Sequence, residues 1–298
     1  MEKETKELQT DKAMEKRAIG ILVFVSFLWG SSFVGAKVCL NGGLMPFETV
    51  FYRSIIGTTV LGIVLRKHLH HFSKEAVMTG VTLGIMSSIC YGVETYGVMW
   101  SDSANAAFLT STNIVMMPFL YAIFFREKIR LKSVGSALLA MVGVGFLSFT
   151  DGITGGFGKG EALLVLTALF YGMSYIVLAL MAKDADPAQI TFLQIGIVTV
   201  AMGVMTLVQG HSTHFGGDVI AATLFLALGP TLLGFLLRNY AVKWVHPVKC
   251  TLIQATQGIW CAGLSVLLFD SKITWKVLLG ALLIFAGIFV ETLLGKKE

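Results

Sequence analysis

The sequence predicts an all-α polytopic membrane protein, with ten transmembrane helices arranged as an inverted repeat of two five-helix halves. Three observations predict this fold: the composition, the length of the apolar runs, and matched motifs in the two halves. Hydrophobic residues make up 55% of the 298 residues and charged residues only 14%, against roughly 25% charged in ordinary soluble domains. The 23 basic and 18 acidic residues are too few to cover a soluble surface of this size. The composition therefore excludes a soluble protein.

Ten apolar runs are long enough to be transmembrane segments (spans), because a hydrocarbon core of about 30 Å needs roughly 20 residues of helix. Helices are expected because lipid offers no partner to unpaired backbone groups, and the runs are too long for barrel strands. Short connections with turn signals, such as Asn41-Gly42-Gly43, separate the runs. The predicted spans are 18–38, 46–66, 76–99, 104–125, 131–150, 160–182, 188–209, 218–240, 246–269 and 274–294.

The spans divide the chain into five parts, and its basic residues orient them. The parts are an N-terminal tail (1–17), a first five-helix repeat (18–150), an extracytoplasmic linker (151–159), a second five-helix repeat (160–294) and a C-terminal tail (295–298). Cytoplasmic loops carry an excess of Lys and Arg. With both termini inside, seventeen such residues lie on the cytoplasmic side and three on the other, and Arg238 is counted as a cytoplasmic flank. We therefore expect a multi-pass protein of the plasma (inner) membrane with both termini cytoplasmic.

Matched motifs in corresponding spans indicate the internal repeat. Residues 29–33 in span 1 and 171–175 in span 6 both read aromatic-Gly-x-Ser-aromatic. An Ala-Leu-Leu run followed by glycine occurs at 137–143 in span 5 and again at 281–287 in span 10. Thr110 and Asn113 in span 4 are paired with Thr251 and Gln254 in span 9. Because each unit has an odd number of spans, the second copy enters the membrane from the opposite side, and carriers of this kind hold their substrate near the midplane between the halves.

Several segments of the sequence resemble those of one family of carriers. The segments are 27–33 in span 1, Phe51-Tyr52-Arg53 in span 2, 104–109 at the start of span 4, and Pro118 followed by Arg126-Glu127-Lys128. Along almost the whole chain the sequence resembles the drug/metabolite transporter superfamily, and within it the EamA-type family. The second half departs from the family pattern, with Gly258-Ile259-Trp260 where span 9 would show a proline and Asp270-Ser271 before span 10.

The resemblance implies a ten-helix carrier in which spans 1, 3, 4 and 6, 8, 9 surround a central cavity. Spans 5 and 10 would be peripheral, where they brace the halves or pair two subunits as a homodimer. Many members of the family export amino acids or other small metabolites from the bacterial cytoplasm.

Glu94 is the most informative single residue, because a carboxylate within a membrane span is costly and usually functional. Ser87, Tyr91 and Glu94 share one face of a helix. Two interpretations stay open for Glu94: a cavity carboxylate that binds a cationic group and carries a proton for coupling, or a residue whose carboxylate reaches the outer headgroups. Glu291, near the inner end of span 10, is expected to reach the headgroups.

The other candidate residues are aromatic or amide side chains of the repeated motifs and of spans 4 and 9. Each could line a substrate cavity, or could pack and hydrogen-bond between helices. Arg53 and Lys37 are expected to anchor the chain at the outer interface. The candidate substrate-binding residues are Trp29, Tyr91, Glu94, Asn113, Tyr171, Tyr175, Gln254 and Gln257.

No motif indicates catalysis, a cofactor or a metal. Walker A, HExxH and GxSxG patterns do not occur, and the loop histidines lack Cys or acidic neighbours that would complete a metal site. The basic clusters are explained as membrane flanks, so no nucleic-acid partner is expected. We expect a non-enzymatic secondary transporter of a small organic metabolite (an amino acid or related compound), with the substrate and the lipid bilayer as partners and export as the direction. An importer or exchanger and a non-transporting membrane scaffold are the alternatives.

Overall fold

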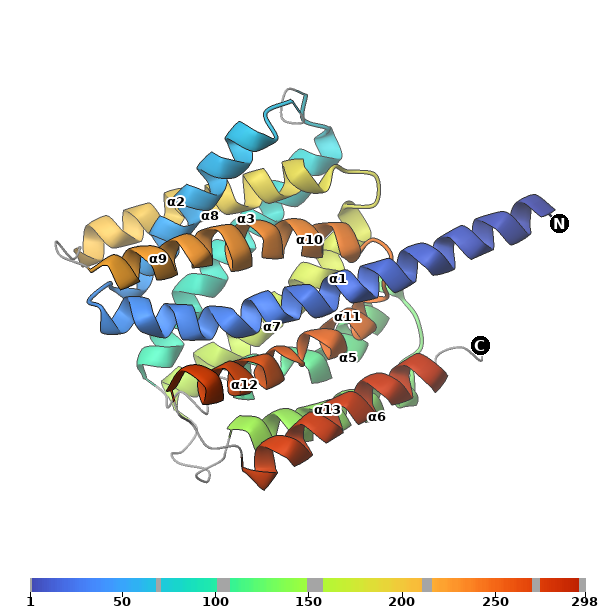
Figure 1. The fold of residues 1–298 in the computed structure, drawn as a ribbon. Helices are drawn as coiled ribbons and strands as arrows, with labels where there is room; N and C mark the ends of the chain where they lie inside the picture. Colours follow the sequence, from blue (N-terminus) through green and yellow to red (C-terminus); the bar gives the residue numbers. More distant parts are fainter. Residues whose placement is uncertain are drawn as a thin grey trace.

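The computed structural model describes residues 2–67, 71–100, 108–148, 158–210, 216–269 and 274–294 as helices and the turns between them. The first half contains α1 (Glu2–Asn41), α2 (Pro46–Val64), α3 (Lys74–Met99), α5 (Asn113–Phe125) and α6 (Leu131–Ser148). The second half contains α7 (Lys159–Met181), α8 (Pro187–Gln209), α9 (Gly217–Leu226), the π-helix η1 (Ala227–Leu233), α10 (Gly234–Ala241), α11 (Pro247–Gln254), α12 (Gln257–Phe269) and α13 (Trp275–Leu294). The start of α1 and the end of α13 lie at the same end of the bundle (Figure 1).

The prediction of an all-α polytopic membrane protein is confirmed. In the described residues, nine helices are long and apolar enough to cross a membrane, and α11 with α12 covers the remaining predicted span. The expected tail at 1–17 is helical from Glu2 and continues directly into the first span. The eighth span is a composite of α9, η1 and α10, and its π-helical part contains Pro230, which has no amide hydrogen to donate and so interrupts the helical ladder.

Helix starts follow the local sequence signals. Proline stands at the beginning of α2, α8 and α11, a position that lacks an intrahelical partner for the amide anyway. The Ser73 hydroxyl accepts a hydrogen bond from the Ala76 amide at 3.1 Å, and the Asp186 carboxylate accepts one from the Ala188 amide at 2.8 Å. These two caps satisfy amides that the first turns of α3 and α8 would otherwise leave unpaired.

Contacts between helices follow the repeat. The helix α1 packs against α12, and its counterpart in the second half, α7, packs against α5. In the same way, α3 packs against α7, and α9 with α10, the counterparts of α3, pack against α1. The contact of α3 with α8 likewise corresponds to that of η1 with α2. Two further contacts, between α2 and α8 and between α6 and α13, join corresponding spans of the two halves. Most of this packing connects one half with the other. The two repeats therefore share one interior instead of forming separate domains.

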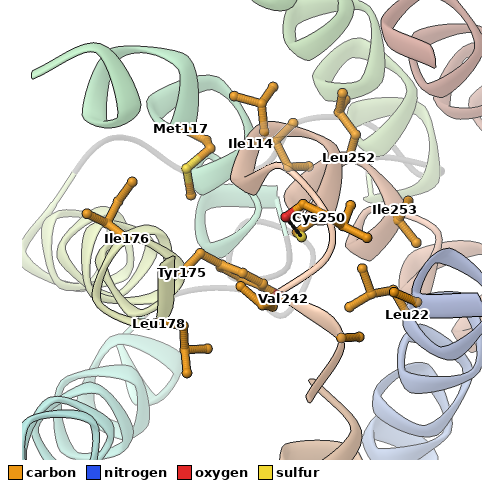
Figure 2. Close-up of a cluster of buried hydrophobic side chains, with 14 of the residues drawn as sticks. Leu22, Ile114, Met117, Tyr175, Ile176, Leu178, Val242, Cys250, Leu252 and Ile253 are labelled. Carbon is orange, nitrogen blue, oxygen red and sulfur yellow. Dashed lines mark hydrogen bonds between the residues drawn. The ribbon is translucent and has the colours of Figure 1, made fainter. Parts of the chain in front are cut away.

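The largest buried cluster lies where the halves meet. Figure 2 shows Ile114 and Met117 of α5 beside Tyr175 of α7 and Leu252 of α11, with Leu22 of α1 on the opposite side. Each of these five side chains is at most 2% exposed. Side chains that are packed this closely fix the relative positions of the helices around them.

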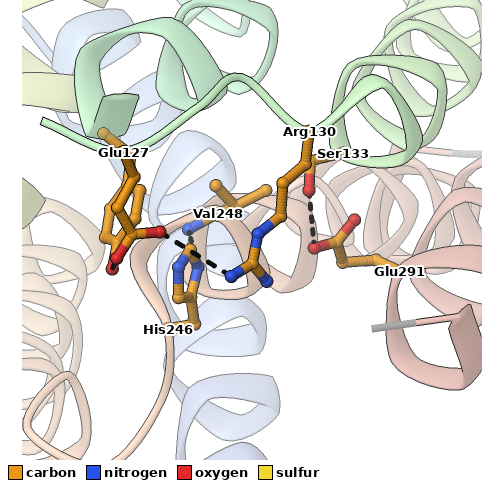
Figure 3. Close-up of polar contacts among 7 residues, drawn as sticks. Glu127, Arg130, Ser133, His246, Val248 and Glu291 are labelled. Atoms are coloured by element: carbon orange, nitrogen blue, oxygen red, sulfur yellow. Dashed lines mark hydrogen bonds and ion pairs between the residues drawn. The ribbon is translucent and has the colours of Figure 1, made fainter. Parts of the chain in front are cut away.

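The helices α6 and α13 form a peripheral pair at one side of the bundle (Figure 1). Their backbones touch: a Cβ at Gly143 would lie 2.6 Å from the carbonyl oxygen of Gly280, so only small residues allow this approach. The expectation for Glu291 is wrong, because its carboxylate accepts a hydrogen bond from the Ser133 hydroxyl at 3.0 Å (Figure 3). It accepts a second one from the Ser136 hydroxyl, also at 3.0 Å. It joins α13 to α6.

Candidate substrate-binding site

A cavity of about 210 Å³ lies between the two halves. It is smaller than the 300–1,000 Å³ usual for pockets that hold drug-sized ligands. All eight residues predicted as a substrate site line it: Trp29, Tyr91, Glu94, Asn113, Tyr171, Tyr175, Gln254 and Gln257. The structure thus brings together side chains from α1, α3, α5, α7, α11 and α12, and their role in binding a substrate stays a prediction.

The cavity lies at breaks in two of the predicted spans. Span 4 turns at Ser111 and Thr112 before α5 begins, and span 9 turns at Ala255 and Thr256 before α12 begins. The predicted bounds of both spans contain no interruption, and the structure adds these turns. The first residues of α5 and α12 are Asn113 and Gln257, 144 residues apart, so the structure pairs Asn113 with Gln257 and not with Gln254.

The helix ends at these breaks place partial backbone charges beside the cavity. A helix end leaves backbone groups without intrahelical partners, and the N-terminal end carries partial positive charge. Carriers built as inverted repeats use such half-helix ends to bind ions and charged groups. Here Asn113 and Gln257, at the starts of two half-helices, both line the cavity.

The side-chain amides of span 9 are hydrogen-bonded to each other and to an aromatic residue of the repeated motif. The hydroxyl of Tyr175 donates to Oε1 of Gln254 at 3.1 Å, and Nε2 of Gln254 donates to Oε1 of Gln257 at 3.3 Å. Tyr175 is 2% exposed and also belongs to the large buried cluster. These residues both pack the interior and line the cavity.

Glu94 is directed into the cavity. It accepts a hydrogen bond from the hydroxyl of Tyr171 at 2.8 Å and lines the cavity wall, which favours the cavity interpretation over the headgroup interpretation. Arg53, expected at the outer interface, also lines the cavity, with its guanidinium 5.0 Å from the centroid of the Tyr91 ring. The interface expectation for Arg53 is therefore wrong.

Arg238 is the residue that sequence reasoning missed. It was counted as a cytoplasmic flank, but it is 3% exposed and lines the cavity. Nη1 donates to the Ser174 hydroxyl at 3.2 Å and Nε to Oδ1 of Asn239 at 3.3 Å. Nη2 is buried without a hydrogen-bond partner in the described structure. Aromatic rings surround the guanidinium at 6.0 Å (Trp29), 5.3 Å (Tyr175) and 5.6 Å (Phe235).

A buried polar network holds Arg238 in place. Nδ2 of Asn239, whose side chain is fully buried, donates to the Thr191 hydroxyl at 3.0 Å and to Oε1 of Gln194 at 3.1 Å. Gln194 in turn donates to the hydroxyl of Ser87 at 2.9 Å. Ser87, predicted on the Glu94 face of span 3, therefore bonds to α8 and supports the network behind the cavity.

The repeat itself could have identified Arg238. The offset of 144 residues that relates spans 5 and 10 also places Tyr91 on Phe235 and Glu94 on Arg238. Each charged residue faces an aromatic residue from the motif of the opposite half: Tyr171 of α7 binds Glu94, and Trp29 of α1 lies beside Arg238. Equivalent positions of the two halves thus place opposite charges on one cavity.

Comparisons with known proteins agree with this architecture. The model of the EamA-like transporter family matches residues 16–149 and again residues 158–293. An uncharacterized transporter of Archaeoglobus fulgidus is 24% identical over 272 residues, covering 91% of this chain and 84% of the relative. The uncharacterized transporter YoaV of Bacillus subtilis is 23% identical and covers 94% of this chain and 97% of its own length. A solved structure described only as a protein crystal structure aligns with a TM-score of 0.81 at 16% identity, over 95% of this chain and 98% of that one, which shows the same fold.

Proposed function

We propose, since the chain belongs to the EamA-like transporter family, that it is a secondary carrier that exports a small organic metabolite, an amino acid or related compound, by alternating access. The observation that carries the proposal is the cavity between the halves, at breaks in repeat-equivalent spans. Substrate sites of inverted-repeat carriers lie at such breaks, where either half can close over them.

We further propose a plasma-membrane location with both termini cytoplasmic. Two observations support this orientation. Lys and Arg are concentrated on one side of the predicted spans, and the start of α1 and the end of α13 lie at the same end of the bundle (Figure 1).

A binding screen followed by a flux assay tests the transport function. The purified protein is heated with a library of amino acids and related metabolites, because a ligand that binds only the folded state raises the apparent melting temperature. Each compound that stabilises the protein is then loaded into proteoliposomes, and exchange of radiolabelled compound across the membrane is followed with time. We expect saturable exchange that empty liposomes lack.

A matched pair of variants connects the flux to the cavity. Asn113→Leu replaces a cavity amide by an apolar side chain of similar size, and Lys128→Gln changes an exposed loop residue. We expect exchange to fall strongly in N113L and to persist in K128Q. Absence of exchange for every compound that binds the parent protein would contradict the proposal and favour a non-transporting scaffold.

A further inference from the structure

We infer that His246 is a positioning residue of the proposed carrier: its neutral imidazole caps the half-helix α11 and so holds the cavity residue Gln254 in place, and protonation of the ring releases that cap. The inference rests on the proposed transport function and adds a dependence on cytoplasmic pH that does not involve Glu94. It comes from a cluster of side chains outside the cavity, at the start of α11 (Figure 3).

His246 caps the N-terminal end of α11. Its Nδ1 atom accepts a hydrogen bond from the amide of Val248 at 3.3 Å (Figure 3), and Pro247 between them has no amide hydrogen to satisfy. The helix has only eight residues, and a helix this short depends on its caps and its packing, because it forms few internal hydrogen bonds. The imidazole therefore satisfies an amide for which α11 has no partner of its own.

The cap requires the neutral form of the imidazole. A ring nitrogen that accepts a hydrogen bond carries no hydrogen, so the hydrogen of neutral His246 is on Nε2. Protonation adds a hydrogen to Nδ1, and two donors, Nδ1–H and the amide of Val248, then face each other. The cap is lost in the same step that charges the ring. Histidine is the side chain whose ordinary pKa places this step between about pH 5 and 8.

The surroundings of His246 do not hold it in the charged form. The ring of Tyr121 of α5 packs against the imidazole, with the two centroids 4.1 Å apart. Nε2 is buried and has no hydrogen-bond partner in the described structure, so no described carboxylate binds this nitrogen. Two acidic and two basic side chains act on the ring with opposite effects: Glu127 and Arg130 of the loop after α5, Glu291 of α13 and Lys249 of α11 itself.

The cap lies one short helix away from the cavity. From Pro247 to Gln254, α11 extends about 12 Å. Its residues Thr251 and Gln254 line the cavity, and Gln254 accepts a hydrogen bond from Tyr175 at 3.1 Å and donates one to Gln257 at 3.3 Å. A shift of α11 therefore moves two lining residues and changes these hydrogen bonds.

Two polar contacts hold this end of α11 when His246 is neutral. One is the cap, and the other is the ion pair between Lys249 and Glu15 of α1 at 2.7 Å. In the proposed orientation this end faces the cytoplasm, so the ring responds to the pH on that side. At acidic pH the cap is released and the first turn of α11 loosens. The carrier then binds its substrate more weakly as the pH falls.

Histidine NMR on the purified full-length protein tests the cap without any substrate. The imidazole nitrogens are isotopically labelled, and the resonances that disappear in His246→Asn are assigned to His246. We expect the Nε2–H tautomer at about pH 7.5 and conversion to the imidazolium as the pH is lowered to about 5. An Nδ1–H tautomer at neutral pH, or a ring that does not titrate between about pH 5 and 8, would overturn the inference.

Three variants connect the cap to transport. His246→Asn keeps a strong N-cap that cannot be protonated, His246→Ala removes the cap, and the matched control His71→Asn removes an exposed imidazole from another loop. Counterflow of a mixture of radiolabelled proteinogenic amino acids into proteoliposomes is measured at about pH 7.5 and 5.5, with the same pH on both sides so that no proton gradient contributes. From the higher to the lower pH, the KM of the parent and of His71→Asn should rise about fivefold more than that of His246→Asn.

The KM separates positioning from general stability. His246→Ala should show at both pH values the raised KM that the parent shows only at acidic pH, with kcat little changed. The same pH dependence of KM in the parent and in His246→Asn would overturn the inference, even if His246→Ala does not fold. Absence of counterflow in every protein at both pH values would instead contradict the proposed function and the role in transport, while the NMR titration would still decide whether the cap exists.

Discussion

Replacing Gly30 by alanine should loosen the contact between α1 and α12 beside the cavity. A Cβ at Gly30 would lie 2.5 Å from the carbonyl oxygen of Gln257 and 2.8 Å from Cβ of Trp260. An ordinary carbon–oxygen contact is about 3.3–3.6 Å, so the helices must separate by nearly 1 Å. Neither obstacle is the free end of a side chain, so the backbone itself has to move.

The magnitude follows from a comparison with two other glycines. Alanine at Gly20 meets no atom within 4 Å and gains up to about 1 kcal/mol of helix propensity. Gly30→Ala has the same gain but costs about 2–3 kcal/mol in overpacking, near the upper end of the usual range. Gly172, the repeat equivalent of Gly30, would place a Cβ 2.9 Å from Cδ1 of Leu120, a terminal methyl group that can rotate away, so its variant should be nearly neutral.

Thermal unfolding in detergent checks this order. Relative to Gly20→Ala, we expect Gly30→Ala to melt about 4–12 °C lower, if about 2–3 kcal/mol is converted with the values for soluble domains of 150–250 residues. Gly172→Ala should lie close to the parent. If Gly30→Ala and Gly20→Ala melt together, the backbone contact between α1 and α12 is not present and the reasoning is refuted.

Three further predictions address topology, coupling and the peripheral pair. In a cysteine-free background, cysteines at the exposed positions Lys128 and Lys159 should react only from the cytoplasm and only from outside, respectively. Labelling of both from the same side would contradict the inverted repeat, and external labelling of Lys128→Cys would contradict the cytoplasmic termini. If Glu94 carries the coupling proton, Glu94→Gln should transport no faster with a pH gradient than without one, and a parent-like response would exclude that role. Glu291→Gln should lower the free energy of unfolding by about 1–2 kcal/mol, because hydrogen bonds to a charged acceptor are stronger than those to a neutral one; an unchanged denaturation midpoint would show that the bonds to Ser133 and Ser136 contribute nothing.

The residues of the cavity were predictable because placing a polar group in lipid costs free energy. Glu94, Asn113 and Gln254 stand out in apolar runs, and a buried polar group needs a partner or a cavity. The direction of a side chain was harder to infer. Arg238 lies near the end of its span, where the positive-inside rule offers a sufficient explanation. The folded chain shows that its guanidinium turns inward, and the sequence signal that indicates this position is its offset of 144 residues from Glu94.

The breaks in spans 4 and 9 could not be read from local sequence. Ser111-Thr112 and Ala255-Thr256 contain neither glycine nor proline, the residues that most often mark a helix interruption. The apolar composition also continues on both sides of each break. Glu291 was misjudged for a related reason: its partners Ser133 and Ser136 lie on another helix, more than 150 residues earlier in the chain, and tertiary contacts of this kind leave no local pattern.

The two halves contribute matching aromatic positions to the cavity but oppositely charged residues. The aromatic positions agree between the halves, since Tyr91 corresponds to Phe235 and both line the cavity, whereas the charged positions hold Glu94 in one half and Arg238 in the other. Two like charges at these positions would repel across a small cavity of low dielectric constant. Opposite charges avoid that repulsion, so each half contributes a different charged side chain to the same cavity.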